Sequence, residues 1–342
     1  MKDKSSPPDG ASDDSASPAP KPTGRRILLG VLAGAVLYGA MALWADLSAL
    51  LTAVAEMPWT VLPLACALSF ANYALRFPRW QRYLHLLDVR LARPTSFLVY
   101  LAGLSLTVTP GKLGEAYKSF LLKDLTGTPI HRSAPIVIAE RVTDLFGFLL
   151  LLALGGLVSH PEQRPLFAAV TVICLGLVAC VSSPRLSGPL LRLCRRLPLL
   201  SSLSDKLEGA LESTRILLAP REIPRATLLA TLGWGLECYA FFLVAEALVP
   251  GAITFQFATF AFALSAILGA VVIIFPGGLG ITEASLGSLL GSRFTLAGLA
   301  AEAARTQAFA ATILIRLCTL WFAVFLGLLA TFLLRRSMRR SP

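Results

Sequence analysis

Two short stretches, PGKLG at residues 110–114 and PGGLG at residues 276–280, interrupt long apolar segments of this chain. Proline lacks a backbone donor and glycine accepts unusual dihedral angles, so a helix does not run cleanly through either motif. In the hydrocarbon core of a membrane, broken backbone occurs where protein buries it or where it lines a watery cavity. Paired interruptions at matching places in two halves of a chain are typical of transporters. The alternative is a pair of ordinary turns between membrane spans.

Composition places the chain among membrane proteins. Its 342 residues are 55% hydrophobic and 15% charged, with a mean hydropathy of +0.70. A soluble domain is nearer to about 45–50% apolar and roughly 25% charged. The net charge of +11 comes from arginines that gather in the connections, which indicates membrane topology and not nucleic-acid binding. We therefore expect an all-α polytopic membrane protein.

The apolar runs divide the chain into a membrane domain, residues 25–336, between a disordered tail at 1–24 and a short basic tail at 337–342. The first run is interpreted as an uncleaved span, with a cleaved signal peptide as the alternative. An amphipathic cytoplasmic connection is expected at 185–225. We predict about six transmembrane helices, at residues 27–44, 59–75, 133–158, 166–181, 226–249 and 305–334.

Arginines fix the orientation of these spans. They crowd the 185–225 connection and the segment after residue 334, so both regions and both termini are expected on the cytoplasmic side of the membrane. Counting back from there puts residues 93 and 131 on the same side. The segment 95–122 is then a re-entrant helical hairpin broken at its PG motif, and the segment 256–292 is a second hairpin that enters from outside. Two full crossings per segment would satisfy the same parity.

The two halves of the chain repeat the same plan. The PG motifs are 276 − 110 = 166 residues apart, and adding 166 to Trp59, where the second span begins, gives Arg225, just before the fifth span. Because the two units have opposite orientations, the spacing suggests an inverted repeat, as in secondary transporters.

Charged residues inside the predicted spans are the candidate site. Isolated charges at this depth cost at least a few kcal/mol each, so they should face the protein interior or water. Glu140 and Asp144 share a helix face with Arg141 beside them, and Glu237 could pair with Arg316 simply to fix packing. Arginines 76 and 79 could signal topology or hold a lipid phosphate. The candidate substrate-binding residues are Arg76, Arg79, Pro110, Gly111, Lys112, Gly114, Glu115, Glu140, Arg141, Asp144, Glu237, Pro276, Gly277, Gly278, Gly280, Glu283 and Arg316.

Four stretches resemble a known family: LRFPRWQRYL (75–84), TPGKLGEAYKSFLL (109–122), ERVTD (140–144) and FPGGLGITEASLGSLL (275–290). In this order they look like the flippase-like, lysylphosphatidylglycerol-synthase transmembrane-region family, over most of residues 25–335. Some members join this module to a cytosolic aminoacyl-transferase domain, for which this chain has no room after its last span. The resemblance therefore implies lipid translocation without lipid synthesis. Stand-alone members are associated with polyprenyl-linked sugars or hopanoid gene neighbourhoods.

The expected function is movement of an anionic or lipid-linked substrate between leaflets: an aminoacyl-phospholipid, a polyprenyl-linked sugar or a hopanoid-type lipid. No nucleophile–base pair, phosphate-binding loop or zinc-ligand spacing is present in the sequence, so we expect no catalytic residue, metal or cofactor. The alternatives are a membrane-embedded transferase that uses Glu140 and Asp144, or an accessory subunit of a lipid-synthesis complex. The expected partner is a membrane lipid, with a homo-oligomer or a lipid-synthesis enzyme left open.

Overall fold

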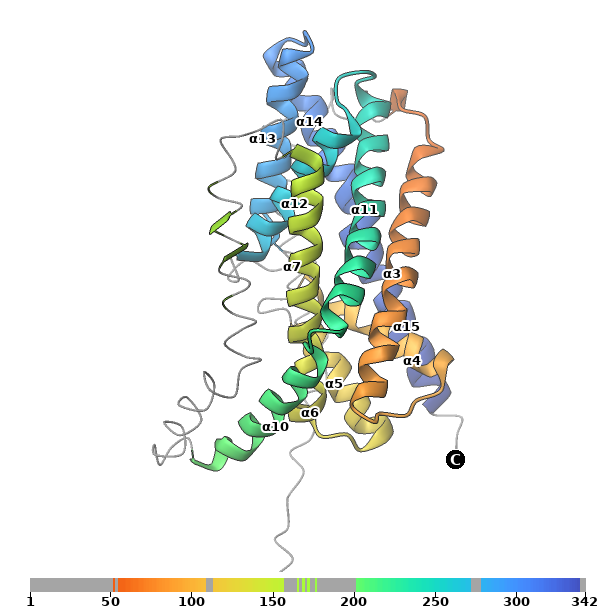
Figure 1. Ribbon diagram of the computed structural model, residues 1–342. Helices are drawn as coiled ribbons and strands as arrows, with labels where there is room; N and C mark the ends of the chain where they lie inside the picture. Colours follow the sequence, from red (N-terminus) through yellow and green to blue (C-terminus); the bar gives the residue numbers. More distant parts are fainter. Residues whose placement is uncertain are drawn as a thin grey trace, which may run out of the picture.

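A computed structural model describes residues 55–108, 113–156, 201–271 and 278–338, with a few isolated positions besides. The predicted tails, the runs 27–44 and 166–181 and residues 185–200 lie outside these ranges or almost wholly so. Within the described ranges the chain is helical, without a strand (Figure 1). The elements are α3 (Val61–Leu86), α4 (Arg93–Ala102), η1 (Gly103–Leu106), α5 (Leu113–Thr126), α6 (Ile130–Ser133), α7 (Pro135–Gly156), α10 (Ser201–Leu217), α11 (Glu222–Leu248), α12 (Phe255–Val271), α13 (Ile281–Leu296), α14 (Ala301–Arg316), η5 (Leu317–Trp321) and α15 (Phe322–Met338).

Helix α3 corrects one expectation from the sequence. The predicted span ends at residue 75, and the arginines that follow it were expected in a cytoplasmic connection. The helix instead continues to Leu86, through Pro78, so that Arg76 and Arg79 lie inside it and are buried. Hydropathy alone ends the helix too early, because a charged turn that is buried among partners looks like a connection in a sequence.

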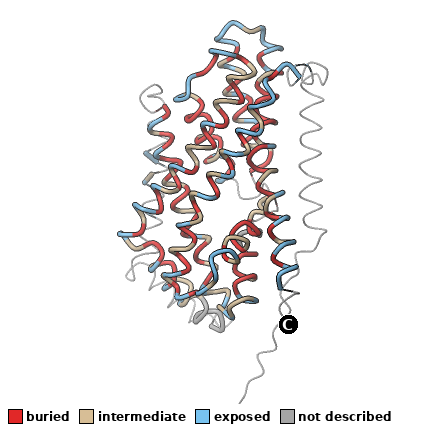
Figure 2. Tube along the Cα trace, turned by 90° about the vertical axis from the view of Figure 1, so that its right-hand side faces the viewer, coloured by how far each residue is buried: buried red, intermediate tan, exposed pale blue. Residues whose placement is uncertain are grey.

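The long helices form an elongated bundle in which α3 packs on α11, α7 packs on α11 and α12, and α13 packs on α14. Figure 2 shows buried and exposed residues alternating along the same helices. Several large apolar side chains point outward, among them Leu154 (73% exposed), Phe325 (60%) and Phe332 (61%). Such a surface suits a lipid environment, since a soluble protein rarely exposes large apolar patches.

Two helices in the described part of the chain are long and apolar enough to cross a membrane. They are Glu222–Leu248, which is α11, and the continuous run Ala301–Met338 formed by α14, η5 and α15. The second is longer at both ends than the predicted 305–334. The count of about six spans remains a prediction.

The helices that flank the two PG motifs lie in different halves of the bundle. In Figure 1, α4 and α5 are in the lower half and α12 and α13 in the upper half. The chain leading into the first motif nevertheless meets the second motif: Val108 and Leu279 belong to one small apolar cluster with Leu320 and Val324 of the last long helix. The two interrupted segments therefore approach each other inside the bundle.

The element boundaries follow the predicted repeat. Helices α11, α12, α13 and α14 begin 161 to 168 residues after α3, α4, α5 and α7, respectively, so four elements recur in the same order at nearly the spacing of the PG motifs. The placement of the two helix pairs in opposite halves agrees with an inverted arrangement. Whether each pair is a hairpin that re-enters one face of a membrane remains a prediction.

Close packing of α15 fixes the position of η1. A Cβ atom at Gly327 would lie 2.2 Å from the backbone nitrogen of Ser105, so only glycine allows these backbones to approach as they do. Between α14 and α15 the helix widens into the π-helical turn η5, where the carbonyl oxygen of Thr319 accepts a hydrogen bond from the Tyr73 hydroxyl at 3.0 Å. The last long helix is thereby tied to both α3 and the first interrupted segment.

Candidate functional site

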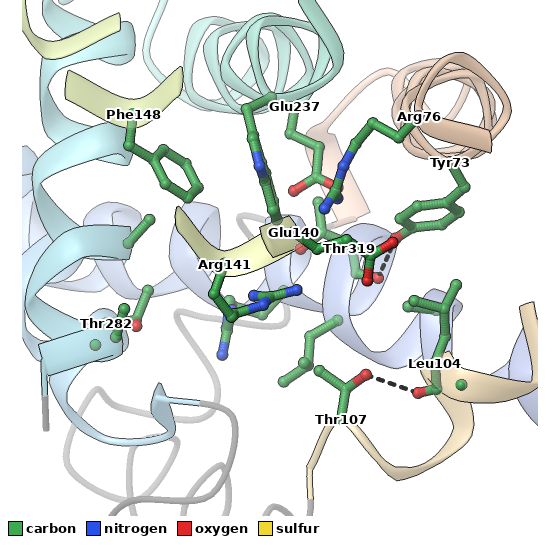
Figure 3. A pocket seen from close by; sticks show the side chains of 18 of the residues that line it. Tyr73, Arg76, Leu104, Thr107, Glu140, Arg141, Phe148, Glu237, Thr282 and Thr319 are labelled. Carbon is green, nitrogen blue, oxygen red and sulfur yellow. Dashed lines mark hydrogen bonds between the residues drawn. The ribbon is translucent and has the colours of Figure 1, made fainter. Parts of the chain in front are cut away.

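A cavity of ≈ 170 Å³ lies inside the bundle, where the two interrupted segments approach each other (Figure 3). A single water needs roughly 10–15 Å³ measured in this way, so the space can hold a polar group of several heavy atoms together with water. Its wall draws on both halves of the chain: Tyr73 and Arg76 from α3, Lys118 from α5, Glu140 and Arg141 from α7, Trp234 and Glu237 from α11, Gly269 from α12, Thr282 from α13, and Arg316 and Thr319 from the last long helix.

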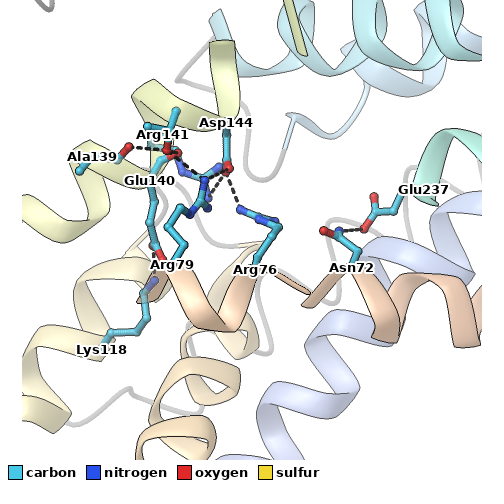
Figure 4. A network of polar contacts seen from close by, with 10 residues as sticks. Asn72, Arg76, Arg79, Lys118, Ala139, Glu140, Arg141, Asp144 and Glu237 are labelled. Carbon is cyan, nitrogen blue, oxygen red and sulfur yellow. Dashed lines mark hydrogen bonds and ion pairs between the residues drawn. The ribbon is translucent and has the colours of Figure 1, made fainter. Parts of the chain in front are cut away.

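Asp144 holds two arginines of α3. Its carboxylate accepts hydrogen bonds from Arg76 Nη2 at 2.6 Å and from Arg79 Nη1 at 2.8 Å (Figure 4). These arginines are one helical turn apart, so both reach the same acid. All three residues are buried, and Arg79 also donates to Thr143 Oγ1 at 3.0 Å. Removing one member of a buried pair of this kind typically costs about 3–5 kcal/mol, because a charge is left without compensation.

Arg141 occupies a different position from the two buried arginines. Its Nη2 lies 3.4 Å from Asp144 Oδ2, and its side chain is 39% exposed. In Figure 3 the guanidinium reaches into the cavity. An arginine placed in this way can exchange contacts with water or with an anionic ligand at low cost, since a partly exposed ion pair contributes only about 0–1 kcal/mol.

A lysine from the first interrupted segment completes this charge cluster. Lys118 Nζ donates to Glu140, and both side chains are buried. The ammonium also lies 4.8 Å from the ring centre of Trp80 and 5.6 Å from that of Tyr100, within the range of cation–π attraction. The stem of this lysine packs against Gly103, where a Cβ atom would come within 2.5 Å of it. Together these contacts anchor α5 to α3, α4 and α7.

The second interrupted segment has its own charged anchor. Glu283, which is fully buried, accepts a hydrogen bond from the backbone N–H of Gly280 at 2.7 Å and one from Arg316 Nε at 2.6 Å. The first contact caps the start of α13, and the second ties that helix end to α14. Gly278 and Gly280 have φ angles of 72° and 90°, which are accessible to glycine at little cost. The PGGLG motif thus ends in a turn whose geometry is set by Glu283.

The remaining acid of the cavity, Glu237, has a neutral partner. Its Oε1 accepts a hydrogen bond from Asn72 Nδ2 at 2.6 Å, and the residue is 3% exposed. The predicted packing pair of Glu237 with Arg316 is therefore wrong, because Arg316 bonds to Glu283 instead. Both residues still line the same cavity, in agreement with their predicted positions near the middle of two spans.

The structure brings together most of the predicted charged residues. Arg76, Glu140, Arg141, Glu237 and Arg316 line the cavity, and Asp144, Arg79 and Glu283 lie directly behind them. Lys112 and Arg141 were the predicted cation partners of Glu140 and Asp144. Arg141 does pair with Asp144, whereas the cation bonded to Glu140 is Lys118. Pro110, Gly111, Lys112, Pro276 and Gly277 lie outside the described residues. Gly114 and Glu115 lie within α5, but their surroundings are not described.

The sequence analysis missed Lys118 and Asn72. Lys118 lies eight residues after Pro110 within the apolar stretch AYKSFLL, and a cation at such a place was a signal that could have been used. Asn72 gave no signal, because a single amide in an apolar helix has no distinguishing pattern. Tyr73, Tyr100 and Trp234 were missed for the same reason, since aromatic residues are common in such helices.

Comparison with known proteins agrees with the resemblance seen in the sequence. The sequence model of the family described as "Lysylphosphatidylglycerol synthase TM region" matches residues 27–327. The curated "UPF0104 membrane protein MJ1078" of Methanocaldococcus jannaschii is 25% identical over 244 residues, which are 69% of this chain and 96% of that protein. The family match covers every residue that lines the cavity.

Proposed function

This chain belongs to the lysylphosphatidylglycerol synthase transmembrane-region family, and we propose that it moves an anionic or lipid-linked substrate between the leaflets of a membrane. The substrate class comprises aminoacyl-phospholipids, polyprenyl-linked sugars and hopanoid-type lipids. The proposed location is the bacterial inner membrane with both termini in the cytoplasm, and the proposed partner is the membrane lipid itself.

The observation that carries the proposal is a cation-lined cavity within the membrane domain. Arg76, Lys118, Arg141 and Arg316 reach it from four different helices, α3, α5, α7 and α14. A phosphate that leaves water loses its hydration, and charged donors can replace that hydration in the protein interior. The volume suits a headgroup, while acyl chains can remain among the outward apolar side chains of the bundle.

The arrangement of the acids favours translocation over a transferase reaction. A general base needs lone pairs that are open to the substrate. Both oxygens of Asp144 bond to arginines, so neither is open to a substrate. Glu140 holds Lys118 through Oε2, while its Oε1 has no hydrogen-bond partner among the described residues. Both acids therefore hold cations in place, and Glu140 alone keeps an oxygen without a partner. Holding cations at fixed positions is what an anion path requires when it is empty, because unpaired buried charges would be costly.

Transfer can be measured in proteoliposomes that contain a phosphatidylglycerol with a fluorescent headgroup. Dithionite, added outside, quenches only the labelled lipids of the outer leaflet, so about half of the fluorescence is lost in protein-free liposomes. A translocase carries inner-leaflet lipids outward, and the quenched fraction then rises above one half. We expect Lys118→Met to reduce transfer to the level of protein-free liposomes. Lys123→Met is the matched control, because Lys123 lies on the same helix, is exposed and does not line the cavity.

A loss of fold must be separated from a loss of function. Lys118→Met leaves Glu140 buried without its cation, and the double variant Lys118→Met with Glu140→Gln removes both charges. If the double variant is as stable as the wild type and still transfers lipid, the cations of the cavity do not carry the substrate. Wild-type protein that transfers no faster than protein-free liposomes, with any lipid of the class, would refute the proposed function.

A further inference from the structure

Glu237 differs from the other acids of the cavity in the kind of partner it has. Glu140, Asp144 and Glu283 each bond to a lysine or an arginine. Within the described residues, the carboxylate of Glu237 bonds to the side-chain amide of Asn72 and forms no ion pair. Protonation of any of the other three acids would break a buried ion pair and leave a cation uncompensated, whereas protonation of Glu237 breaks none.

The amide partner suits both protonation states of this acid. A side-chain amide carries a donor end and an acceptor end, so it can donate to a carboxylate or, turned around, accept from a carboxylic acid. At present Asn72 Nδ2 donates to Glu237, and Asn72 Oδ1 is buried without a hydrogen-bond partner. That oxygen lies against Gly233, where a Cβ atom would come within 2.5 Å of it. An arginine in this place would serve the ionised acid alone.

The surroundings of Glu237 make its charge sensitive to an anion. The ionisable groups near it come from several helices: Tyr73 and Arg76 of α3, Asp144 of α7 and Arg316 of α14. Cys238 is its neighbour on α11. Glu140, Arg141 and Lys118 lie elsewhere on the cavity wall. The guanidinium of Arg76 is committed to Asp144 and stacks 4.7 Å from the ring centre of Trp234. The guanidinium of Arg316 is committed to Glu283. Figure 3 shows Glu237 directed toward the cavity beside Arg76.

We propose that Glu237 is the proton-binding residue of this cavity, and that it takes up a proton when an anionic headgroup enters and returns the proton to water when the headgroup leaves. This inference rests on the proposed function and adds its coupling to protons. The step is a simple proton transfer: an O–H bond of hydronium in the cavity breaks as the O–H bond of the Glu237 carboxylic acid forms, and a water molecule is left. When the headgroup leaves, the acid returns the proton to water and hydronium forms again.

The physical basis is linkage between two ligands at one site. A phosphate beside an ionised Glu237 brings two negative charges into a poorly hydrated space, so binding of the phosphate favours the neutral acid. By reciprocity, the neutral acid binds the phosphate more tightly. Over the pH range in which one proton is taken up with each lipid, affinity should fall by up to about tenfold for each unit that the pH rises. A proton gradient can then bias the direction of transfer, as buried acids do in other transporters.

The direct test measures protons released or taken up on binding, without any transport. Purified protein in a weakly buffered micelle solution with a pH dye is titrated with short-chain phosphatidylglycerol, and in parallel with inorganic phosphate. We expect an uptake of up to about one proton per lipid bound by the wild type. An equal uptake with inorganic phosphate would assign the effect to the phosphate chemistry alone. Uptake with the lipid but not with phosphate would assign it to the complete headgroup and its anchor.

Two isosteric variants separate Glu237 from the other acids. Glu237→Gln should bind the lipid with an affinity that no longer depends on pH and should take up no proton. Glu222→Gln is the matched control on the same helix, because Glu222 pairs with Arg82 away from the cavity, with Nη2 to Oε1 at 2.7 Å. The control should behave like the wild type. Equal proton uptake in Glu237→Gln and in the wild type would overturn the proposal.

A spectroscopic readout covers the case in which Glu237→Gln does not fold. Infrared difference spectra of the wild type should gain the carbonyl band of a protonated carboxylic acid when lipid is added, and Glu237→Asp should shift that band. Lipid binding with no such band, or a band that does not shift, would also overturn the proposal. A wild type that binds none of the lipids would remove the proposed function itself, and the inference with it. Wild-type transfer that is intact but free of proton uptake would remove only the inference.

Discussion

Asp144→Asn is expected to destabilise the protein far more than its neighbour Arg141→Gln. The aspartate holds Arg76 at 2.6 Å and Arg79 at 2.8 Å, and the side chains of all three are at most 7% exposed. Loss of the charge leaves two buried guanidinium groups without their anion, which should cost about 3–5 kcal/mol. We expect the lower end of this range, because the amide oxygen of asparagine still accepts one hydrogen bond. Arg141→Gln affects a side chain that is 39% exposed and should cost at most about 1 kcal/mol.

The measurement is equilibrium unfolding in mixed micelles, with the near-UV signal of the buried aromatic residues as the probe. Arg79→Met provides an internal comparison, because it leaves Asp144 bonded to Arg76 and should cost less than Asp144→Asn. Equal destabilisation by Asp144→Asn and Arg141→Gln would refute the reasoning, since it would mean that burial of the two α3 arginines does not decide the energy of this cluster.

Three further outcomes are expected. Gly327→Ala should lower the free energy of unfolding in detergent by about 1–3 kcal/mol, because the new methyl group would overpack against the backbone of η1. Gly235→Ala should leave it unchanged, because its nearest new contact would be at 3.8 Å. Arg141→Gln should abolish lipid transfer in the dithionite assay while the protein remains folded, and transfer at the wild-type rate would exclude this arginine from the path. Single cysteines at positions 93 and 131, in a cysteine-free background, should react with an impermeant reagent from the same side of the membrane; reaction from opposite sides would rule out a re-entrant first segment.

Sequence reasoning recovered the helical class, the repeat spacing and most members of the charged cluster. It succeeded where the information is local: interruption by proline and glycine, apolar length, and acids placed one turn apart, such as Glu140 and Asp144. It also placed Glu237 and Arg316 among the candidate site residues, and both line the cavity, although they do not pair with each other.

It failed where the answer depends on contacts between helices. Asn72 and Glu237 are 165 residues apart, and Arg316 and Glu283 are 33 apart, so no spacing rule can pair them. By charge alone, Arg316 can pair with Glu237 or with Glu283. Glu283 caps the start of α13, which places its carboxylate beside Arg316 at the end of α14, and the ion pair forms there. The arginines of α3 were misplaced because a buried ion pair satisfies charges that would otherwise end a span.

The wide turn at Leu317–Trp321 lets one long helix keep two rotational alignments. An α-helix turns by about 100° per residue, so in an unbroken helix the direction of the side chains in the first half would fix their direction in the second half. Here α14 directs one face to α13 and α11, while α15 must present Gly327 to η1 and its neighbours to α4. The additional residue in the π-helical turn resets the phase between these two demands. One long helix can thus pack closely against both halves of the bundle, because each of its two segments has its own rotational alignment.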